Sequence, residues 1–239
     1  MIFLILNLFL NLQTLTCQEG QNETTYKDIY ITDYLDFESK LRLNKSADGI
    51  DKVAYSSIDG DPYIYRDFVT GKLILRTGEI LQIDLRYDTY SDQIQFKDKD
   101  QIFKVINENN LALVVIDTIM FQYCMYQKSK DDQTSVENSW FILQKNGKCN
   151  LLIKKNVRLQ AAELPKAYQE AKPAKFIHIA DTYYLKKESK NAVRVSGKKD
   201  LLSILSDKEK EVSEYIKTNK LGVKDLDDLD KIIMFYNSL

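Results

Sequence analysis

The chain has 239 residues, of which 44% are hydrophobic and 29% charged, and its 34 basic and 35 acidic residues give a net charge of -1. This composition is typical of a globular protein and excludes a disordered chain. A net charge so close to zero provides no long-range attraction for nucleic acid or anionic lipid, so we expect no nucleic-acid partner.

The first seventeen residues are uncharged and mostly Leu, Ile and Phe. A short apolar run without a basic stop-transfer flank predicts a signal peptide over residues 1–17, although the basic residues that usually begin such a signal are missing. We therefore expect an exported protein, in the periplasm, at the cell surface or outside the cell, with no transmembrane segment after signal removal. The alternative is a lipoprotein acylated at Cys17, but Leu15 and Thr16 poorly match the small residues that normally precede a lipid-modified cysteine.

Residues 18–54 begin as a polar leader and continue into a stretch compatible with either a helix or a strand. Residues 55–195 are strand-like, because runs of β-branched and aromatic residues alternate with turn signals. Gly78 predicts the turn of one hairpin, whose second arm carries apolar residues on both faces and is expected to be covered on both. Asn146-Gly147 predicts a second hairpin with a type I′ turn.

Three further breaks divide the strand-like region. Asp117-Thr118 splits the long apolar run LALVVIDTIMFQYCMY into two strands, and Ala180-Asp181 interrupts KFIHIADTYYLKKE. A polar loop is expected over 128–138, and the proline-containing stretch AAELPKAYQEAKPAK predicts a mixture of helix and coil. The whole region therefore predicts an antiparallel, β-rich body.

Residues 196–239 have the apolar spacing of helices, which predicts two or three short helices packed on the body. Ser206 and Glu209 have the spacing of a capping box. Four aspartates lie at the start of the last helix, where negative charge complements the helix dipole. The apolar stripe of that helix consists of Leu226, Leu229, Ile232, Ile233 and Tyr236.

Two cysteines, Cys124 and Cys149, remain beyond the predicted signal. The sequence places them one strand apart in a meander, at a Cα separation of roughly 10 Å, whereas a disulfide tolerates roughly 7 Å at most. We therefore expect two unpaired thiols.

The sequence offers little catalytic chemistry. Its single histidine, His178, lies in a strand-like run and is expected to be a partly exposed sheet residue, which leaves no set of ligands for a histidine-rich zinc site. No G-x-S-x-G elbow and no glycine-rich phosphate loop is present. We assign no catalytic, cofactor-binding or metal-ligating residue and expect no cofactor.

The stretch DGDPYIY, residues 59–65, places two carboxylates around a glycine. An EF-hand calcium loop would need further oxygen ligands and a glutamate at its twelfth position, so we predict a turn into the β body instead. This turn would lead into a short strand with Tyr63 and Tyr65 on one side and Ile64 on the other. The fifteen tyrosines of the chain either bind sugars or peptides on a sheet face or fill half-buried strand positions.

The stretches DGDPYIYRDFVTGKLILRTGE, LRYDTYSDQIQF, KPAKFIHIADTYYLKK, KKDLLSILSDKEKEVSEYIKTNKL and IIMFYNSL together resemble a family of exported bacterial proteins frequent in the Bacteroidota. In that family a G-x-P-Y opening, an LRY strand and a helical tail ending near YNSL recur in this order. The resemblance covers residues 55–239, and its first motif matches Gly60, Pro62 and Tyr63 rather than the aspartates. It implies an exported protein of the cell envelope or exterior and transfers no catalytic residue.

We therefore predict an α+β fold with a β-rich body over 55–195 and a helical region over 196–239. The favoured function is a non-enzymatic envelope or secreted protein that binds another envelope protein or a glycan, or plays a structural role. The alternative is a carboxylate-based hydrolase acting on polysaccharide or peptidoglycan.

Overall fold

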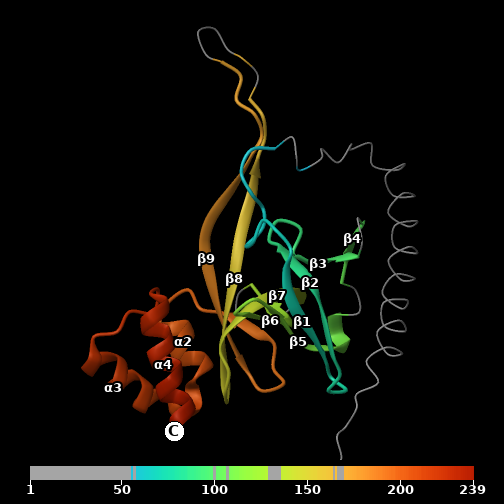
Figure 1. Ribbon diagram of the computed structural model, residues 1–239. Helices are drawn as coiled ribbons and strands as arrows, with labels where there is room; N and C mark the ends of the chain where they lie inside the picture. The colour runs from blue at the N-terminus through green and yellow to red at the C-terminus, as the bar shows by residue number, and fades with distance from the viewer. Residues whose placement is uncertain are drawn as a thin grey trace, which may run out of the picture.

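The computed structural model describes residue 55 and residues 58–98, 101–105, 108–128, 136–163, 165 and 170–239. The predicted signal peptide, its Cys17 and the segment 18–54 lie outside these residues. The described chain forms one large sheet followed by three C-terminal helices, which confirms the α+β class (Figure 1). The strands are β1 (Val69–Leu75), β2 (Ile80–Asp88), β3 (Gln93–Asp98), β4 (Gln101–Lys104), β5 (Leu111–Ile116), β6 (Ile119–Gln127), β7 (Val136–Lys145), β8 (Cys149–Gln160), β9 (Lys175–Lys187) and β10 (Ala192–Arg194).

The sheet has the strand order β10-β9-β8-β7-β6-β5-β1-β2-β3-β4, and neighbouring strands in this order are antiparallel. One additional pairing closes part of it. The short strand β10 pairs with β9 and also, in parallel, with the end of β6, where Ala192 lies opposite Tyr126. Strands β6 to β10 therefore form a closed ring, whereas β5 and β1 to β4 continue as an open sheet.

Two apolar cores lie on opposite faces of this sheet. Successive strand residues point to opposite faces, so the adjacent Trp140 and Phe141 of β7 enter different cores. Trp140 packs in the first core, between residues of β1 to β7, and Phe141 packs in the ring core with Tyr126 and Tyr184. Phe141 and Tyr184 meet edge to face with their ring centroids 5.0 Å apart. The ring is thus filled by side chains.

The three helices form a third core against β8 and β9. They are α2 (Lys198–Ile204), α3 (Glu209–Asn219) and α4 (Leu226–Ser238), and they group beside the lower ends of these two strands (Figure 1). The predicted stripe of α4 is confirmed: Leu229, Ile232, Ile233 and Tyr236 are buried with Cys149, Leu151 and Leu185 of the sheet.

The start of α3 differs from the prediction. Ser206 begins a separate 3-10 turn, Ser206–Lys208, and no side chain caps α3, which begins at Glu209 itself. The capping-box prediction is therefore wrong. The aspartate prediction for α4 is confirmed, since Asp225 is the N-cap residue and accepts a hydrogen bond from the Asp228 amide.

The turns predicted between the strands are confirmed in part. Gly78 has a φ of 93° in the β1–β2 turn, and Asp117 has a φ of 54° in the turn between β5 and β6. Asn146 and Gly147 lack the positive φ angles of a type I′ turn, so that prediction is wrong. Gly147 instead lies against Asn237 of α4, where an added Cβ would come 2.4 Å from the side-chain nitrogen. This glycine allows the helix to approach closely.

Three further expectations need correction. The β2 arm is covered mainly on one face, because Leu81, Leu85 and Tyr87 are buried while Ile80 is 61% exposed. Strand β7 begins at Val136, inside the predicted polar loop. In the described part of the predicted helix-coil passage, Glu163 and Lys172 form an antiparallel bridge, so the chain is extended there.

Strands β8 and β9 extend well beyond the rest of the sheet as a two-stranded arm (Figure 1). The predicted interruption at Ala180-Asp181 is a register shift within one continuous strand: Lys154 pairs with Thr182, and Asn156 pairs with Ile179. The Asn156 side-chain nitrogen donates to the carbonyl oxygens of Lys154 and Ala180, at 3.1 and 3.0 Å. One amide side chain thereby satisfies the backbone groups that the shift leaves unpaired.

Candidate functional site at the foot of the arm

A polar and aromatic constellation joins the body to the arm, from Lys154 at the base of the arm to Phe176, which pairs with Leu159 near the end of β8. We call it the foot, and it consists of Tyr55, Tyr63, Tyr87, Asp88, Tyr90, Asp92, Ser139, Lys154 and Phe176. These residues come from the start of the described chain, β2, the β2–β3 connection, β7, β8 and β9. Segments distant in sequence are therefore joined here.

A partly buried ion pair forms the inner half of the foot. Lys154 lies 2.7 Å from one carboxylate oxygen of Asp92, and their side chains are only 14% and 29% exposed. The Tyr87 hydroxyl donates to the same oxygen at 2.6 Å. The Ser139 hydroxyl donates to the other oxygen at 2.6 Å, and Lys154 also contacts this hydroxyl. Both Asp92 oxygens are thus satisfied.

Serine and lysine side chains in contact also occur in nucleophilic catalysis, so their surroundings here matter. Ser139 is 1% exposed and donates its hydroxyl hydrogen to Asp92, and the Lys154 ammonium is paired with the same carboxylate. Burial, followed by the charge of Asp92, raises the pKa of Tyr87 well above its ordinary value. These contacts hold the β2–β3 connection on β7 and β8, which is a structural role.

An aromatic cluster forms the outer half of the foot. The Tyr55 ring lies 6.3 Å from Tyr63, 6.1 Å from Tyr90 and 5.1 Å from Phe176, measured between centroids. The Tyr90 and Phe176 rings are 5.2 Å apart. These separations fall in the range of favourable aromatic contacts. Phe176 is buried, whereas Tyr90 is 42% exposed, so the cluster opens to solvent on one side.

Asp88 forms the floor of this cluster and is 1% exposed. One carboxylate oxygen accepts hydrogen bonds from the backbone amides of Tyr90 and Ser91, both at 3.0 Å. The other oxygen accepts a bond of 3.5 Å from Gln95. Burial, then the charge of Asp88, raises the pKa of Tyr55. The Tyr55 hydroxyl therefore stays protonated beside the buried carboxylate.

The stretch DGDPYIY borders the foot and is a turn, as predicted. Gly60 has a φ of 84°, and an added Cβ would meet the carbonyl oxygen of Phe176 at 2.7 Å. The Asp61 side chain accepts a hydrogen bond from the Tyr63 amide at 2.9 Å. The predicted strand is wrong, because the chain bends after Tyr63 and both Ile64 and Tyr65 pack against the first core.

The single histidine is an exposed residue of β9, as expected. The Nε2 atom of His178 lies 2.8 Å from the carbonyl oxygen of Asp61, which ties the turn to the arm. No group of three or more histidine, cysteine or acidic side chains in the described part of the chain is placed to hold a metal ion. Cys124 and Cys149 are both free, which confirms the expectation of unpaired thiols.

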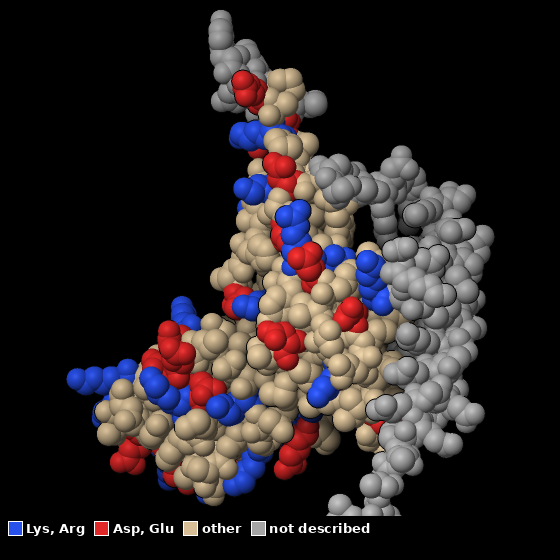
Figure 2. Space-filling view, viewed as in Figure 1, with Lys and Arg blue, Asp and Glu red and all other residues tan. Residues whose placement is uncertain are grey.

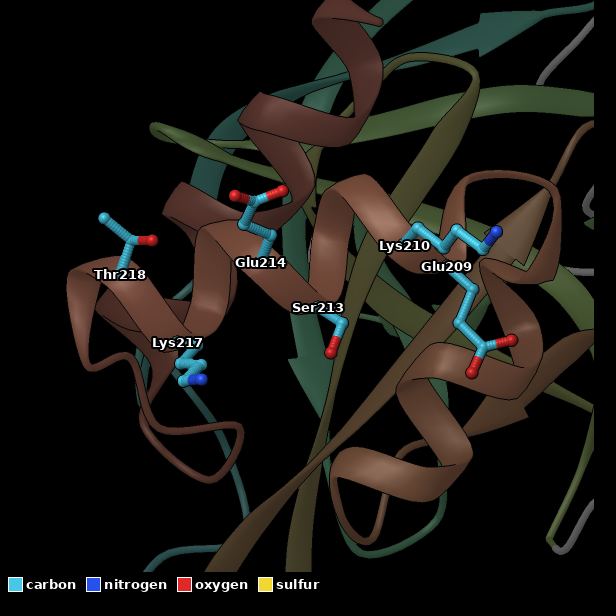
Figure 3. Close-up of a pocket in the computed structure, with 6 residues that line it drawn as sticks. All are labelled: Glu209, Lys210, Ser213, Glu214, Lys217 and Thr218. Atoms are coloured by element: carbon cyan, nitrogen blue, oxygen red, sulfur yellow. The ribbon is translucent and has the colours of Figure 1, made fainter.

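A hollow lies on the helical region but has little chemistry. It measures about 670 Å³ and is lined by Glu209, Lys210, Ser213, Glu214, Lys217 and Thr218. All six belong to α3, and Figure 3 shows their side chains spread along the helix rather than converging on a centre. One helix face cannot enclose a ligand, so the foot is the stronger candidate.

Acidic and basic side chains are interspersed over the visible face of the arm, body and helices (Figure 2). This face therefore has no single-sign patch of the kind that attracts nucleic acid. Among the described residues, no helix has the length and apolar character needed to cross a membrane.

Comparison of the chain with protein-family models, with curated proteins and with solved structures finds no match. Sequence reasoning identified Gly60, Pro62 and Tyr63 as one unit but did not connect them with Asp88, Asp92 or Lys154. The only signal for the foot was the excess of tyrosine, because the pairings that join its members are long-range.

Proposed function

We propose that the protein is an exported, non-enzymatic binding protein that docks on another protein of the cell envelope through the β8–β9 arm. The observation that carries this proposal is the projection of the arm beyond the sheet (Figure 1). Export is supported by the uncharged apolar run of residues 1–17 and by the resemblance described above.

The arm has an open strand edge. Strand β7 pairs with β8 only as far as Ile153, so in the described residues Asn156 to Gln160 pair with β9 alone. An open edge presents backbone amide and carbonyl groups to which an extended peptide can add as a further strand. This geometry favours a protein partner over a glycan.

The arm also exposes apolar side chains. Leu159 is 40% exposed and Ile179 is 47% exposed. Phe176 is buried and contacts the rings of Tyr55 and Tyr90. A two-stranded ribbon is marginally stable alone in water, and this one is fixed to the body by the Asp92–Lys154 ion pair and the aromatic cluster. The foot therefore holds the arm against the body, although the exposed arm residues Leu159 and Ile179 belong to none of the three cores.

The alternative hydrolase has less support. A general acid needs a carboxyl group with a raised pKa beside a second carboxylate in a cleft. Asp88 and Asp92, the two carboxylates of the foot, both accept hydrogen bonds from within the protein. The carboxyl groups of the described chain with a shifted pKa, such as Glu137 beside Lys128, have it lowered.

The test compares two matched variants in a cross-linking pull-down from envelope fractions. Ile179→Lys changes the arm, and Ile80→Lys changes another exposed isoleucine, on β2 away from the arm. We expect a partner that wild type and Ile80→Lys retain and Ile179→Lys loses. Equal retention by both variants would remove the arm from the proposal, and release of sugar from purified peptidoglycan would favour the hydrolase.

A further inference from the structure

Lys154 and Asp92 meet in the inner half of the foot in a geometry that suits a reaction as well as an ion pair. The Lys154 Nζ atom lies 2.7 Å from one Asp92 oxygen, so an amino group and a carboxyl group are already in contact. The backbone of Asp92 has a φ of 54°, in the left-handed region that is uncommon for residues other than glycine. The fold therefore holds this carboxylate against the lysine at some cost to its own backbone.

Two hydroxyl groups hold the carboxyl group in place. Tyr87 donates to the oxygen that contacts Lys154, and Ser139 donates to the other oxygen, each at 2.6 Å. Donors on both oxygens stabilise the negative charge that develops there when an amine attacks the carboxyl carbon. The Ser139 hydroxyl also contacts the Lys154 nitrogen. It therefore bridges the two groups and can pass a proton from one to the other.

The surroundings of the pair contain little water. Ser139 and Trp140 are 1% and 2% exposed, and the Lys154 side chain is 14% exposed. The Trp140 carbonyl oxygen accepts a hydrogen bond of 3.4 Å from Lys154, and the centroid of the Phe141 ring lies 5.7 Å from the lysine nitrogen. Burial costs an ion pair more than an uncharged pair, and the exclusion of water favours a reaction that releases it.

We propose that Lys154 and Asp92 form a modification site at which the two side chains condense to an isopeptide bond. One proton passes from the ammonium through Ser139 to the carboxylate, which gives an amine and a carboxylic acid. The amine nitrogen attacks the carboxyl carbon, a C–N bond forms, and the C–OH bond breaks. The leaving hydroxyl takes a second proton from the nitrogen and departs as water, so the reaction balances without any further reactant.

The bond joins the β2–β3 connection to β8 at the base of the arm. An ion pair between these segments can separate and re-form, whereas an amide bond does not open on unfolding. The arm is therefore fixed to the body covalently. This inference concerns how the arm is anchored and does not depend on what the arm binds.

Tryptic peptide mapping of the purified protein tests the proposal. We expect the peptide 87–97, which contains Asp92, to be joined to the peptide 149–155, in which the modified Lys154 is not cleaved. The joined species should weigh about 18 Da less than the sum of the two peptides, because one water is lost. Recovery of the two segments only as separate peptides from the folded protein would overturn the proposal.

The Lys155–Asp181 pair is a matched control in the same molecule. Its nitrogen and oxygen are also 2.7 Å apart, but the Lys155 side chain is 38% exposed, so water solvates both charges. We expect no joined peptide from this pair. A linkage formed there in equal yield would overturn the assignment, because contact alone would then be sufficient for the reaction.

Two variants separate the covalent bond from the ion pair. Lys154→Arg keeps a positive charge beside Asp92 but removes the amine, so its peptides should remain separate. Ser139→Ala removes the hydroxyl bridge, and the joined fraction of its folded protein should fall by at least about tenfold. An undiminished joined fraction in Ser139→Ala would contradict the proposed proton transfer. The map of the wild type decides the existence of the bond even where a variant fails to fold.

Discussion

Asn237 holds both backbone groups of Cys149. Its side-chain oxygen accepts a hydrogen bond from the Cys149 amide at 2.8 Å, and its nitrogen donates to the Cys149 carbonyl at 3.0 Å. The amide of one helix residue thus replaces the neighbouring strand that Cys149 lacks on this side. We call these two hydrogen bonds, which join α4 to the start of β8, the polar lock.

Gly147 and Asn237 should be strongly coupled. Gly147→Ala places a Cβ 2.4 Å from the Asn237 nitrogen, so we expect it to destabilise the protein by about 2 kcal/mol through the displaced lock. In an Asn237→Ala background the obstacle is gone, and the same change should cost much less. Urea unfolding of the four proteins of this cycle measures the coupling. Gly197→Ala, with nothing within 4 Å of the new Cβ, is the control, and additive costs would contradict the lock.

Lys154 and Lys155 provide a comparison of two partly buried ion pairs that differ in the exposure of the lysine. Each lies 2.7 Å from an aspartate, Asp92 and Asp181 respectively, but the lysine side chains are 14% and 38% exposed. Lys154→Met leaves Asp92 without its counter-charge and should cost about 2 kcal/mol or more. Lys155→Met should cost less than about 1 kcal/mol, because solvent screens that pair. Chemical denaturation tests the ranking, and equal costs would contradict the structural role of the foot.

Asp207 gives the helical region a defined pH dependence. A hydrogen bond from Lys187 lowers the pKa of its carboxyl group, burial opposes this, and a hydrogen bond from Tyr236 adds to it. A lowered folded-state pKa means that the stabilisation is present above the unfolded-state value and is lost as the pH falls through the folded-state value. Wild type should exceed Asp207→Asn in stability by less than about 1 kcal/mol at neutral pH, since the carboxylate is half-exposed. A difference that persists below about pH 2 in acid unfolding would contradict this assignment.

The turn at residues 59–65 should depend on its tyrosine rather than on its charges. The Arg86 guanidinium lies 3.7 Å from the Tyr63 ring centroid, so Tyr63→Ala removes a cation–π contact and one wall of the aromatic cluster. We expect a cost of about 2 kcal/mol. The double change Asp59→Asn and Asp61→Asn keeps the side-chain acceptor for the Tyr63 amide and should stay within about 1 kcal/mol of wild type. Thermal unfolding separates the two, and the reverse ranking would restore a role for the carboxylates.

The two thiols should be unreactive in the folded protein. Burial raises the pKa of Cys124 to about 11 and that of Cys149 to about 12, so neither is appreciably a thiolate at neutral pH. We expect slow alkylation in buffer, with the partly exposed Cys124 ahead of the buried Cys149, and rapid labelling of both in urea. Mass spectrometry of the labelled peptides identifies the sites. A peptide in which the two are disulfide-linked would contradict the structure.

Local patterns predicted most of the secondary structure because local chemistry determines it. The positive φ of Gly78, the turn at Asp117 and the apolar stripe of α4 follow from the preferences of single residues and from helical spacing. Asn146-Gly147 shows the limit of this reasoning. The predicted hairpin is present, but the predicted turn type is wrong. The glycine at this position allows close contact with Asn237, a residue far along the chain, and does not adopt a positive φ angle.

The foot could not be predicted for the same reason. Its ion pair joins Asp92 to Lys154, and its aromatic cluster joins Tyr55 to Phe176, so each contact depends on strand order and register. Nothing in the local sequence distinguishes Lys154 from Lys155, yet Lys154 lies in the foot with its side chain 14% exposed and Lys155 is 38% exposed. The parallel pairing of β10 with β6 is equally invisible to local patterns.

The pairing of Ala192 with Tyr126 has a consequence for the order of folding. The ring cannot close until the chain beyond β9 is available, and pairings between residues so far apart form slowly. A chain that emerges with its N-terminus first therefore holds Tyr126, Phe141 and Leu152 open to solvent while the later strands are still missing. During that interval these side chains offer a binding surface for chaperones and expose the chain to proteases and to aggregation.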